Sequence, residues 1–469
     1  MQITVFKKYD IRGIIDQEIA VEETYRLAQA IIAYFKQKNP QLSNIILGMD
    51  GRTHSPLIKE QVCKAVLNSG INVTFIGTCS TPLFYFANEI LQTDGGIMIT
   101  ASHNPKNYNG IKLMLNKKSV FDQDIIEIKN LFYSQAHFTE QQPGIYKEQS
   151  LVSEYIRVLS DQFAHLKGKP IKAVIDCAHG ATAVIIPELI NQMEWDHIKL
   201  MYATIDGNFP AHEADPTKEE NILELRQNLH NEYIGISFDG DGDRMGALTE
   251  NGRLLRGDEL TALFCQAIKK EVGPFKMVAD IKCAHALLKE FQSWDLTHIL
   301  TPCGIGFVRE AIRKNHALFG GELSCHFCFN DRYFGFDDGI YAMMRLLEII
   351  DKEQCQLSAL YKNLPPCYCS AEMRLLSTHE LKNQIVEDIK TKLAHRIDLN
   401  LVTIDGIRAE LPYGCATIRS SNTEPMLSVR FEGTTQKNLD QITDEFYTLL
   451  IPYFEKEYLT KILKKPASE

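Results

Sequence analysis

The chain of 469 residues is 45% hydrophobic and 23% charged, and its formal net charge at pH 7 is −10. This length predicts several domains rather than one core, in a globular protein of ordinary composition. The negative charge argues against nucleic-acid binding, so an anionic substrate would need a local basic pocket. Because no apolar run approaches the ~20 residues that span a bilayer and the N-terminus shows no signal-peptide pattern, we expect a cytoplasmic protein without a membrane partner.

The twelve cysteines are scattered, which is typical of reduced thiols in that compartment. Two close pairs, Cys325/Cys328 and Cys367/Cys369, have to be weighed as zinc ligands. The second pair has a one-residue spacer and follows a proline-rich, linker-like segment. We interpret both pairs as thiols rather than as zinc ligands.

A pattern of apolar runs occurs three times along the chain. Each copy begins with a run that ends in aspartate, at residues 44–50, 173–176 and 277–280. A helix-like stretch and a second run follow, at 73–76, 198–202 and 298–300. Each copy then reaches a third run that ends in a polar loop, at Ser102, Asp239 and Glu322. Strands alternating with helices predict three similar α/β domains with mixed sheets.

Turn-forming dipeptides mark the expected domain boundaries, at Pro143-Gly144, Asn251-Gly252 and Pro365-Pro366. The predicted domains are 1–146, 147–251, 252–365 and 366–469. The last has no fourth copy of the pattern and is predicted to be a separate α+β domain that ends in a helix over residues 439–454.

The first candidate site residues lie near the N-terminus, where Lys8-Tyr9-Asp10-Ile11-Arg12-Gly13 offers a basic segment. Lys112 is a further basic residue, shortly after Asn109-Gly110. Surface lysines and arginines are usually only solvated charges. A site for phosphate dianions nevertheless needs several of them in an acidic protein.

The segment Thr100-Ala101-Ser102-His103-Asn104-Pro105 is the most informative part of the sequence. It follows a buried strand over residues 96–99, and Asn104-Pro105 turns the chain away. Ser102 is therefore presented at a strand end, where the active sites of open α/β sheets usually lie. The sequence predicts a hydroxyl nucleophile here.

A carboxylate cluster, Asp239-Gly240-Asp241-Gly242-Asp243-Arg244, follows the third run of the second domain. Its alternating glycines allow the three carboxylates to fold around one small cation, and hard oxygen ligands favour Mg²⁺ over zinc. An EF-hand is the rival interpretation, since Glu250 falls at the twelfth loop position. Arg244 occupies the position of the required glycine, however, and a strand-like run precedes the loop.

Two further loops carry polar side chains. In Gly321-Glu322-Leu323-Ser324-Cys325-His326, an extended backbone would point Glu322 and Ser324 to the same side, as contacts for sugar hydroxyls. His326 is either a proton carrier or a polar residue at a domain edge. The segment 419–425 joins the Arg419 guanidinium to hydroxyl and amide groups, a combination that can bind phosphate or simply form a turn.

Together these five motifs resemble the α-D-phosphohexomutase superfamily, in particular its bacterial phosphomannomutase/phosphoglucomutase branch. The resemblance covers nearly the whole chain and keeps the family's motif order. It implies three similar α/β domains and a fourth, α+β domain around a central cleft. It also implies an enzyme that interconverts hexose 1-phosphate and hexose 6-phosphate, of mannose or glucose, through phosphoserine and a bound 1,6-bisphosphate.

The resemblance implies a role for each matching residue. Ser102 is similar to the phosphoserine, and Asp239, Asp241 and Asp243 to the Mg²⁺ ligands, with Ser102 completing the protein side of the shell. Five residues match positions beside the phosphoserine or its phosphoryl group, or positions linked to proton transfer or cleft charge: Arg12, His103, Lys112, Arg244 and His326. Lys112 or His326 would suit a general base if its pKa were lowered. Eight match substrate contacts: Tyr9, Lys282, Glu322, Ser324, Arg419, Ser421, Asn422 and Thr423.

The implied cofactors are Mg²⁺ and, as activator, glucose 1,6-bisphosphate or mannose 1,6-bisphosphate. The expected partner is the phosphosugar substrate, and the chain is expected to be a monomer or a weak homo-oligomer. Two departures bear on sugar preference: Cys325 replaces a glycine of the sugar motif, and Ile305 follows Gly304 where relatives often carry histidine.

Three alternatives remain. A phosphoglucosamine mutase usually has glutamine where this chain has Leu323, and glycine where it has Asn422. A non-catalytic sugar-phosphate-binding protein would be indicated by loss of Ser102 or of an aspartate, and none is missing. A phosphatase would need an admitted, activated water, which a four-domain cleft should exclude.

Overall fold

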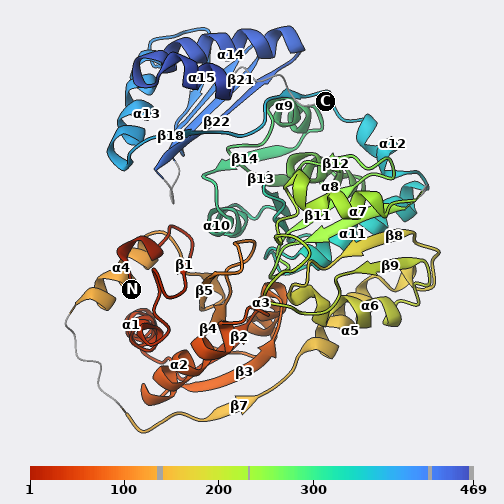
Figure 1. Cartoon of the computed structure of the whole chain (residues 1–469). Coiled ribbons are helices and arrows are strands. Elements are labelled where there is room, and N and C mark those ends of the chain that lie inside the picture. The colour runs from red at the N-terminus through yellow and green to blue at the C-terminus, as the bar shows by residue number, and fades with distance from the viewer. Residues whose placement is uncertain (135–140, 231–232, 421–424, 464–469) are drawn as a thin grey trace.

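A computed structural model describes residues 1–134, 141–230, 233–420 and 425–463 of the chain. It contains three α/β domains and a fourth domain around a middle region (Figure 1). The described part of the chain holds no helix long and apolar enough to cross a membrane.

The first domain is built on a seven-stranded sheet with the order β1-β5-β4-β2-β3-β7, and β6 pairs with β5. Its strands are β1 (Ile11–Ile14), β2 (Asn44–Met49), β3 (Asn72–Thr78), β4 (Gly95–Ile99), β5 (Tyr108–Leu115), β6 (Lys118–Ser119) and β7 (Tyr146–Glu148). Its helices are α1 (Glu23–Lys38), α2 (Ser55–Asn68), α3 (Thr81–Ile90) and α4 (Gln123–Tyr133). The central strand β4 is buried along its whole length, as a sheet covered on both faces requires.

The second and third domains use smaller sheets. The second has β8 (Ala173–Asp176), β9 (Ile198–Met201), β10 (Ile234–Phe238), β11 (Met245–Leu248) and β12 (Leu254–Leu255), with α5 (Val152–Gln162), α6 (Ile186–Gln192) and α7 (Leu223–Gln227). The third has β13 (Lys276–Asp280), β14 (Thr297–Thr301), β15 (Phe319–Gly321) and β16 (Phe327–Phe329). Its helices are α8 (Gly257–Val272), α9 (His285–Ser293), α10 (Ile305–Asn315), α11 (Gly339–Glu353) and α12 (Leu357–Lys362).

The repeat predicted from the sequence is confirmed by the strand order. The runs β5-β4-β2-β3, β11-β10-β8-β9 and β16-β15-β13-β14 are the same arrangement in three sheets. In each, the first, second and third strands of the repeat are parallel, and a fourth strand returns antiparallel to the third. The loop after the third strand therefore lies at equivalent places in the three domains, and it carries Ser102, Asp239 and Glu322.

The C-terminal domain has a different, six-stranded sheet. Its strands are β17 (Tyr368–Cys369), β18 (Met373–Leu376), β19 (Asn400–Val402), β20 (Ile407–Leu411), β21 (Gly414–Ser420) and β22 (Met426–Gly433). Its helices are α13 (His379–Leu393), α14 (Gln436–Leu450) and α15 (Lys456–Leu463). The predicted helix over 439–454 was wrong at both ends. Thr435 caps its start through the Asn438 amide, and the segment with Pro452 forms a separate 3-10 turn.

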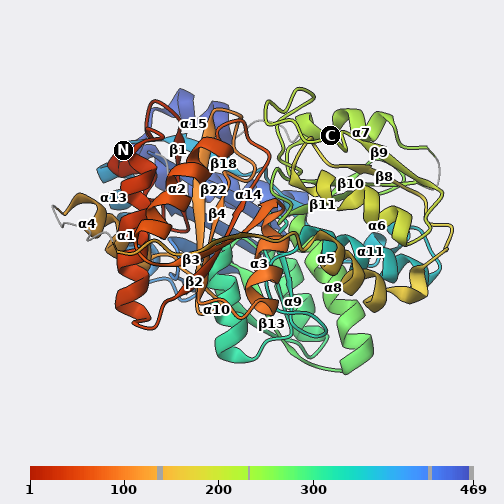
Figure 2. The same cartoon turned by 90° about the horizontal axis from the view of Figure 1, so that it is seen from below.

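Two kinds of contact join the domains. One hydrophobic cluster runs through the first three, so that α3 packs beside α5 with the Phe86 and Tyr155 rings 5.3 Å apart (Figure 2). The C-terminal domain has a core of its own and meets the third domain through polar groups. Arg408 Nη1 donates to the carbonyls of Ile281 and Cys283, each at 2.8 Å.

Candidate active site

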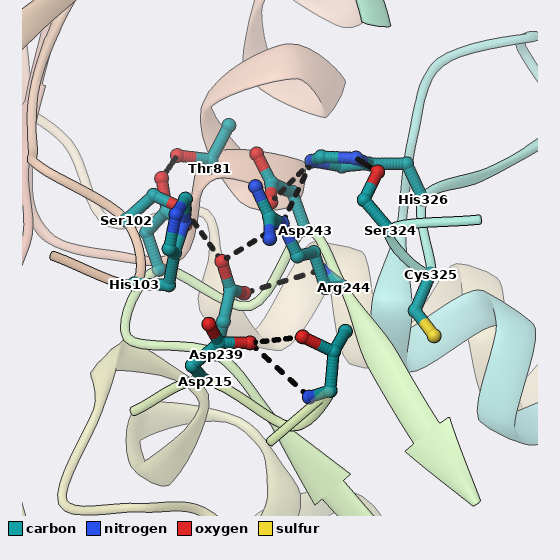
Figure 3. Close-up of polar contacts among 12 residues, drawn as sticks. Thr81, Ser102, His103, Asp215, Asp239, Asp243, Arg244, Ser324, Cys325 and His326 are labelled. Carbon is teal, nitrogen blue, oxygen red and sulfur yellow. Dashed lines mark hydrogen bonds and ion pairs between the residues drawn. The ribbon is translucent and has the colours of Figure 1, made fainter. Parts of the chain in front are cut away.

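The serine predicted as nucleophile lies in the loop that follows β4. Ser102 is 1% exposed, and its φ of +50° is in the left-handed region, as expected where a backbone is held for function. Its Oγ donates to Asp239 Oδ2 of the second domain across 2.6 Å (Figure 3). The serine loop and the aspartate loop, which are 137 residues apart in sequence, thus form one site.

Two arginines, Arg52 and Arg12, hold the serine loop in place through hydrogen bonds. The fully buried Arg52 donates to the backbone carbonyls of Ser102 and Asn104, and further to those of Pro105 and Tyr108. Arg12, on β1, donates to the Ala101 carbonyl at 3.1 Å and to Asn104 Oδ1 at 2.6 Å. Arg12 was expected at a position linked to proton transfer or cleft charge, and it lies against this loop.

The three predicted metal ligands are all fully buried. Oxygen atoms of Asp239, Asp241 and Asp243 lie within 4.8 Å of one another. Asp241 Oδ2 accepts from Thr81 Oγ1 at 2.6 Å and Thr100 Oγ1 at 3.1 Å, whereas Asp241 Oδ1 has no hydrogen-bond partner among the described residues. A buried carboxylate oxygen without a donor is costly unless a cation satisfies it. These residues therefore fit a hard divalent cation.

Burial, followed by the repulsion of Asp243 and Asp241, raises the pKa of Asp239 well above its usual range. Such mutual repulsion is what a bound cation would relieve.

Lys112, on β5, provides positive charge for the same carboxylates. Its Nζ lies 2.7 Å from Asp241 Oδ2 and also contacts Asp243. Burial alone would lower the pKa of Lys112, but Asp241 and Asp243 outweigh it and hold the pKa well above 10.5. The lowered pKa on which a general-base role for Lys112 depends is thus not found in this arrangement.

His326 connects the second and third domains. Its Nε2 lies 3.2 Å from Asp243 Oδ1, and its Nδ1 lies 2.9 Å from Glu322 Oε2. Burial and Arg244 oppose its protonation, yet Asp243 and Glu322 outweigh them and raise the pKa of His326 to about 10. Arg244 Nε lies 3.2 Å from the imidazole and 3.8 Å from Asp239 Oδ2 (Figure 3). Arg244 and His326 therefore place positive charge beside the carboxylates that contact Ser102.

His103 differs from His326 in its charge. Burial, and then the positive charge of Arg244 and Arg12, lowers the pKa of His103 well below 6.5. Its Nδ1 lies 3.2 Å from Ser102 Oγ. A neutral imidazole in that place can exchange a proton with the serine hydroxyl.

The predicted sugar contacts, Glu322 and Ser324, are brought together, but not by an extended strand. Residues 323–324 form a turn after β15, and within it Ser324 Oγ lies 3.3 Å from Glu322 Oε2. Glu322 Oε1 accepts from the Gly304 amide at 2.8 Å. The expectation of an extended backbone was therefore wrong, because the chain turns back here to begin β16.

The remaining predicted substrate contacts come from three domains. Arg419 is held by two hydrogen bonds to Asp405 Oδ2, at 2.9 and 2.6 Å, and Asp405 also accepts from the Cys303 amide at 3.0 Å. Lys282 Nζ lies 3.5 Å from Glu372 Oε2. The Tyr9 ring covers Gly304 so closely that a Cβ there would lie 2.2 Å from it. Ser421, Asn422 and Thr423 lie outside the described residues.

Both departures in the sugar-reading region can be located. Cys325 adopts a φ of +68°, a conformation that favours glycine, and Figure 3 shows its sulfur pointing away from His326. The added Cys325 thiol is buried in the protein. Ile305 begins α10 and packs on the apolar cluster of the third domain.

The sequence did not predict four residues that hold the site residues in place. Arg52, Thr81, Thr100 and Asp405 all contact candidate residues directly. The only sequence signal for Arg52 was its place after the aspartate that ends the first strand of the repeat. Thr81 and Asp405 had no local signal, since their partners are 160 and 14 residues away.

Comparison with known proteins gives the same architecture. Models of phosphoglucomutase/phosphomannomutase domains I, II, III and the C-terminal domain match residues 4–136, 153–252, 256–368 and 381–449. The chain is 33% identical to a phosphomannomutase/phosphoglucomutase of Pseudomonas syringae pv. tomato. The similarity extends over 449 residues, which is 95% of each chain. It is 33% identical to a phosphoglucomutase of Neisseria gonorrhoeae, over 95% of this chain and 96% of that one.

A solved structure of a phosphoglucomutase/phosphomannomutase family protein from Burkholderia thailandensis superimposes with a TM-score of 0.88 at 28% identity, over 100% of this chain and 99% of that chain. The order of the four domains, the shared sheets and the full-length relatives agree. The chain belongs to the phosphoglucomutase/phosphomannomutase family, within the α-D-phosphohexomutase superfamily.

Proposed function

We propose that this protein is a phosphohexomutase, of the isomerase class, that interconverts the 1-phosphate and 6-phosphate of mannose, glucose or both. The observation that carries the proposal is the buried Ser102 hydroxyl, 2.6 Å from Asp239 Oδ2 in a triad of carboxylates that also contacts Lys112 and Arg244. The names of the full-length relatives support the same reaction.

In the proposed reaction phospho-Ser102 gives its phosphoryl group to a hydroxyl of the sugar monophosphate. The bond from phosphorus to Ser102 Oγ breaks as the bond to the sugar oxygen forms; the sugar hydroxyl gives its proton to a general base, Ser102 Oγ takes up a proton, and a 1,6-bisphosphate results. After this intermediate turns end for end, Ser102 Oγ attacks the other phosphate, neutral His103 takes the serine hydroxyl proton, and the sugar oxygen that is released takes up a proton. Lys112, Arg244 and protonated His326 stabilise the charge of the moving phosphoryl group, and positioning supplies most of the catalysis.

Asp239, Asp241 and Asp243, with an oxygen on Ser102, would hold Mg²⁺, and when bound the ion would neutralise charge on the phosphoryl group. Glu322 and Ser324 would bind sugar hydroxyls. Arg419, Ser421, Asn422 and Thr423 would bind the phosphate that is not being transferred, with Tyr9 and Lys282 nearby. Glucose or mannose 1,6-bisphosphate would act as activator by phosphorylating Ser102.

The test is a ³¹P NMR time course with Mg²⁺ and a trace of glucose 1,6-bisphosphate. Mannose 1-phosphate, glucose 1-phosphate and glucosamine 1-phosphate are supplied separately at equal concentration. We expect the first two to be converted to 6-phosphates, with little action on the third and no activity in Ser102→Ala. Conversion of the glucosamine compound alone, or release of inorganic phosphate, would contradict the proposal.

A further inference from the structure

Two thiols, those of Cys367 and Cys369, lie on the segment that leads from the third domain into the fourth. Cys367 directly precedes the short strand β17, and Cys369 ends it, opposite Glu432 of β22. The two Sγ atoms lie 2.7 Å apart. Both residues are partly exposed, whereas nine of the twelve cysteines are buried. This pair is therefore both close and accessible.

A buried arginine gives the two sulfurs different properties. Arg430 Nη2 lies 3.3 Å from Cys369 Sγ. The hydrogen bond from the Cys367 thiol, with help from Arg430, outweighs burial and lowers the pKa of Cys369. The same hydrogen bond, together with burial, raises the pKa of Cys367. Cys369, the sulfur beside the guanidinium, is accordingly the more acidic thiol of the pair.

A metal ion is the competing occupant, because an oxygen of Glu432 and the two sulfurs lie within 4.8 Å of one another. Two contacts argue against it. Glu432 Oε2 already accepts from the His285 amide at 2.6 Å, and Arg430 Nη2 lies 3.8 Å from Glu432 Oε1. A fixed guanidinium beside both kinds of ligand neutralises their charge and repels a cation.

We propose that Cys367 and Cys369 are a redox-active dithiol that closes to a disulfide by exchange with a small-molecule disulfide such as glutathione disulfide. The Cys369 thiolate attacks one glutathione sulfur and releases the other glutathione as its thiolate, which takes a proton. Cys367 then loses its proton and attacks Cys369 Sγ, and the second glutathione leaves as thiol. The protein loses two protons and two electrons, and one glutathione disulfide becomes two glutathiones.

The spacing makes the disulfide reversible. Two residues apart in extended chain, Cα atoms lie about 6.5–7 Å apart, at the upper end of the ~4.4–6.8 Å that a disulfide spans. Bonds formed in such short loops are readily reduced. Oxidation also removes the charged sulfur from Arg430, whose Nη1 donates to the Lys282 carbonyl at 2.6 Å across the domain interface. The dithiol is thus connected, through Arg430, to the backbone at Lys282 in the third domain.

The test uses the reduced, full-length protein and glutathione disulfide at neutral pH, followed by alkylation of free thiols and tryptic mapping. Residues 363–374 form one tryptic peptide that holds both cysteines and no other. We expect this peptide to resist alkylation, to be two hydrogens lighter, and to return to the dithiol with dithiothreitol. Cys367→Ser should stop at a stable glutathione adduct on Cys369. Cys369→Ser should react with glutathione disulfide at least tenfold more slowly than the wild-type protein.

Cys355→Ser is the matched control, because Cys355 is the other partly exposed cysteine, and it should behave as wild type. The wild-type mapping needs no variant to fold. The proposal is overturned if both thiols of the peptide stay free while Cys355 is modified. It is equally overturned if Cys369→Ser and Cys367→Ser react at the same rate, or if one bound zinc per chain protects the pair.

Discussion

Ser102 of the first domain and Gly240 of the second are in backbone contact: a Cβ added at Gly240 would lie 2.5 Å from the Ser102 carbonyl oxygen. At this distance the Cβ and the Ser102 oxygen would clash, so one of the two loops would have to shift. The oxygen cannot rotate away, because it belongs to the backbone and not to a flexible side chain. The aspartate loop can therefore reach the serine only because glycine separates Asp239 from Asp241. The pair sets the distance between nucleophile and carboxylates.

Gly240→Ala should consequently lower mutase activity while leaving the protein folded. A displacement of about 1 Å between reacting groups costs on the order of 100-fold in rate. We expect a fall in kcat of that size, measured by ³¹P NMR, with a circular dichroism spectrum like that of wild type. Activity within twofold of wild type would mean that the contact does not position Ser102.

Arg52 should be a determinant of stability as well as of the serine loop. Replacing it by Met leaves carbonyls of the loop without a donor and Asp50 without its ion pair at 3.2 Å. Breaking a buried ion pair in this way costs about 3–5 kcal/mol in the free energy of unfolding. Urea denaturation of the wild type and of Arg52→Met measures this difference in the free energy of unfolding. The control is Arg157→Met, whose exposed pairs with Glu154 and Asp161 should contribute far less to the free energy of unfolding.

The contrast between these residues explains what could be predicted from the sequence. Asp239, Asp241 and Asp243 are close in sequence, so their meeting follows from the local backbone, and the repeated runs predicted the strands that carry them. Arg52 and Thr81 act on partners 50 and 160 residues away. Such contacts depend on how the sheets pack, which no local pattern records. The raised pKa of Lys112 could not be predicted for the same reason: the carboxylates that control it lie on another domain.

Asp241→Asn should abolish a metal-dependent gain in stability. A ligand that binds only the folded state raises its stability by about 2.7 kcal/mol at 100 times its Kd. We expect the melting temperature of the wild-type protein, freed of metal with EDTA, to rise on adding Mg²⁺. In Asp241→Asn one ligand is neutral, so the rise should be largely lost. Equal rises in both proteins would argue that the ion binds elsewhere.

Stability of the metal-free protein should depend on the protonation of His326. Its pKa is raised from 6.5 to about 10 in the folded protein. The stabilisation is therefore fully present below pH 6.5 and is lost as pH rises through about 10. Denaturation curves in EDTA between pH 6 and pH 10 should show a decline on the order of 2–4 kcal/mol. His326→Gln should remove the part of this decline that its charge causes, and an unchanged pH profile in that variant would contradict the assignment.

The way the C-terminal domain is attached leads to the last prediction. Because its core is separate from the cluster shared by the other three domains, its docking depends on polar contacts such as those of Arg408 with the carbonyls of Ile281 and Cys283. Arg408→Met keeps most of the side-chain volume but removes both hydrogen bonds, each worth about 1.5–3 kcal/mol for a charged donor.

We expect limited proteolysis to cut Arg408→Met at least tenfold faster within residues 364–372, and KM for hexose phosphate to rise more than kcat falls, since Arg419 is carried by the loosened domain. Arg374→Met, an exposed change on the same sheet, should leave both unchanged. If Arg408→Met were instead cut equally in all four domains, the C-terminal domain would have to be part of a single cooperative unit, and the Arg408 contacts would not be what holds it to the third domain.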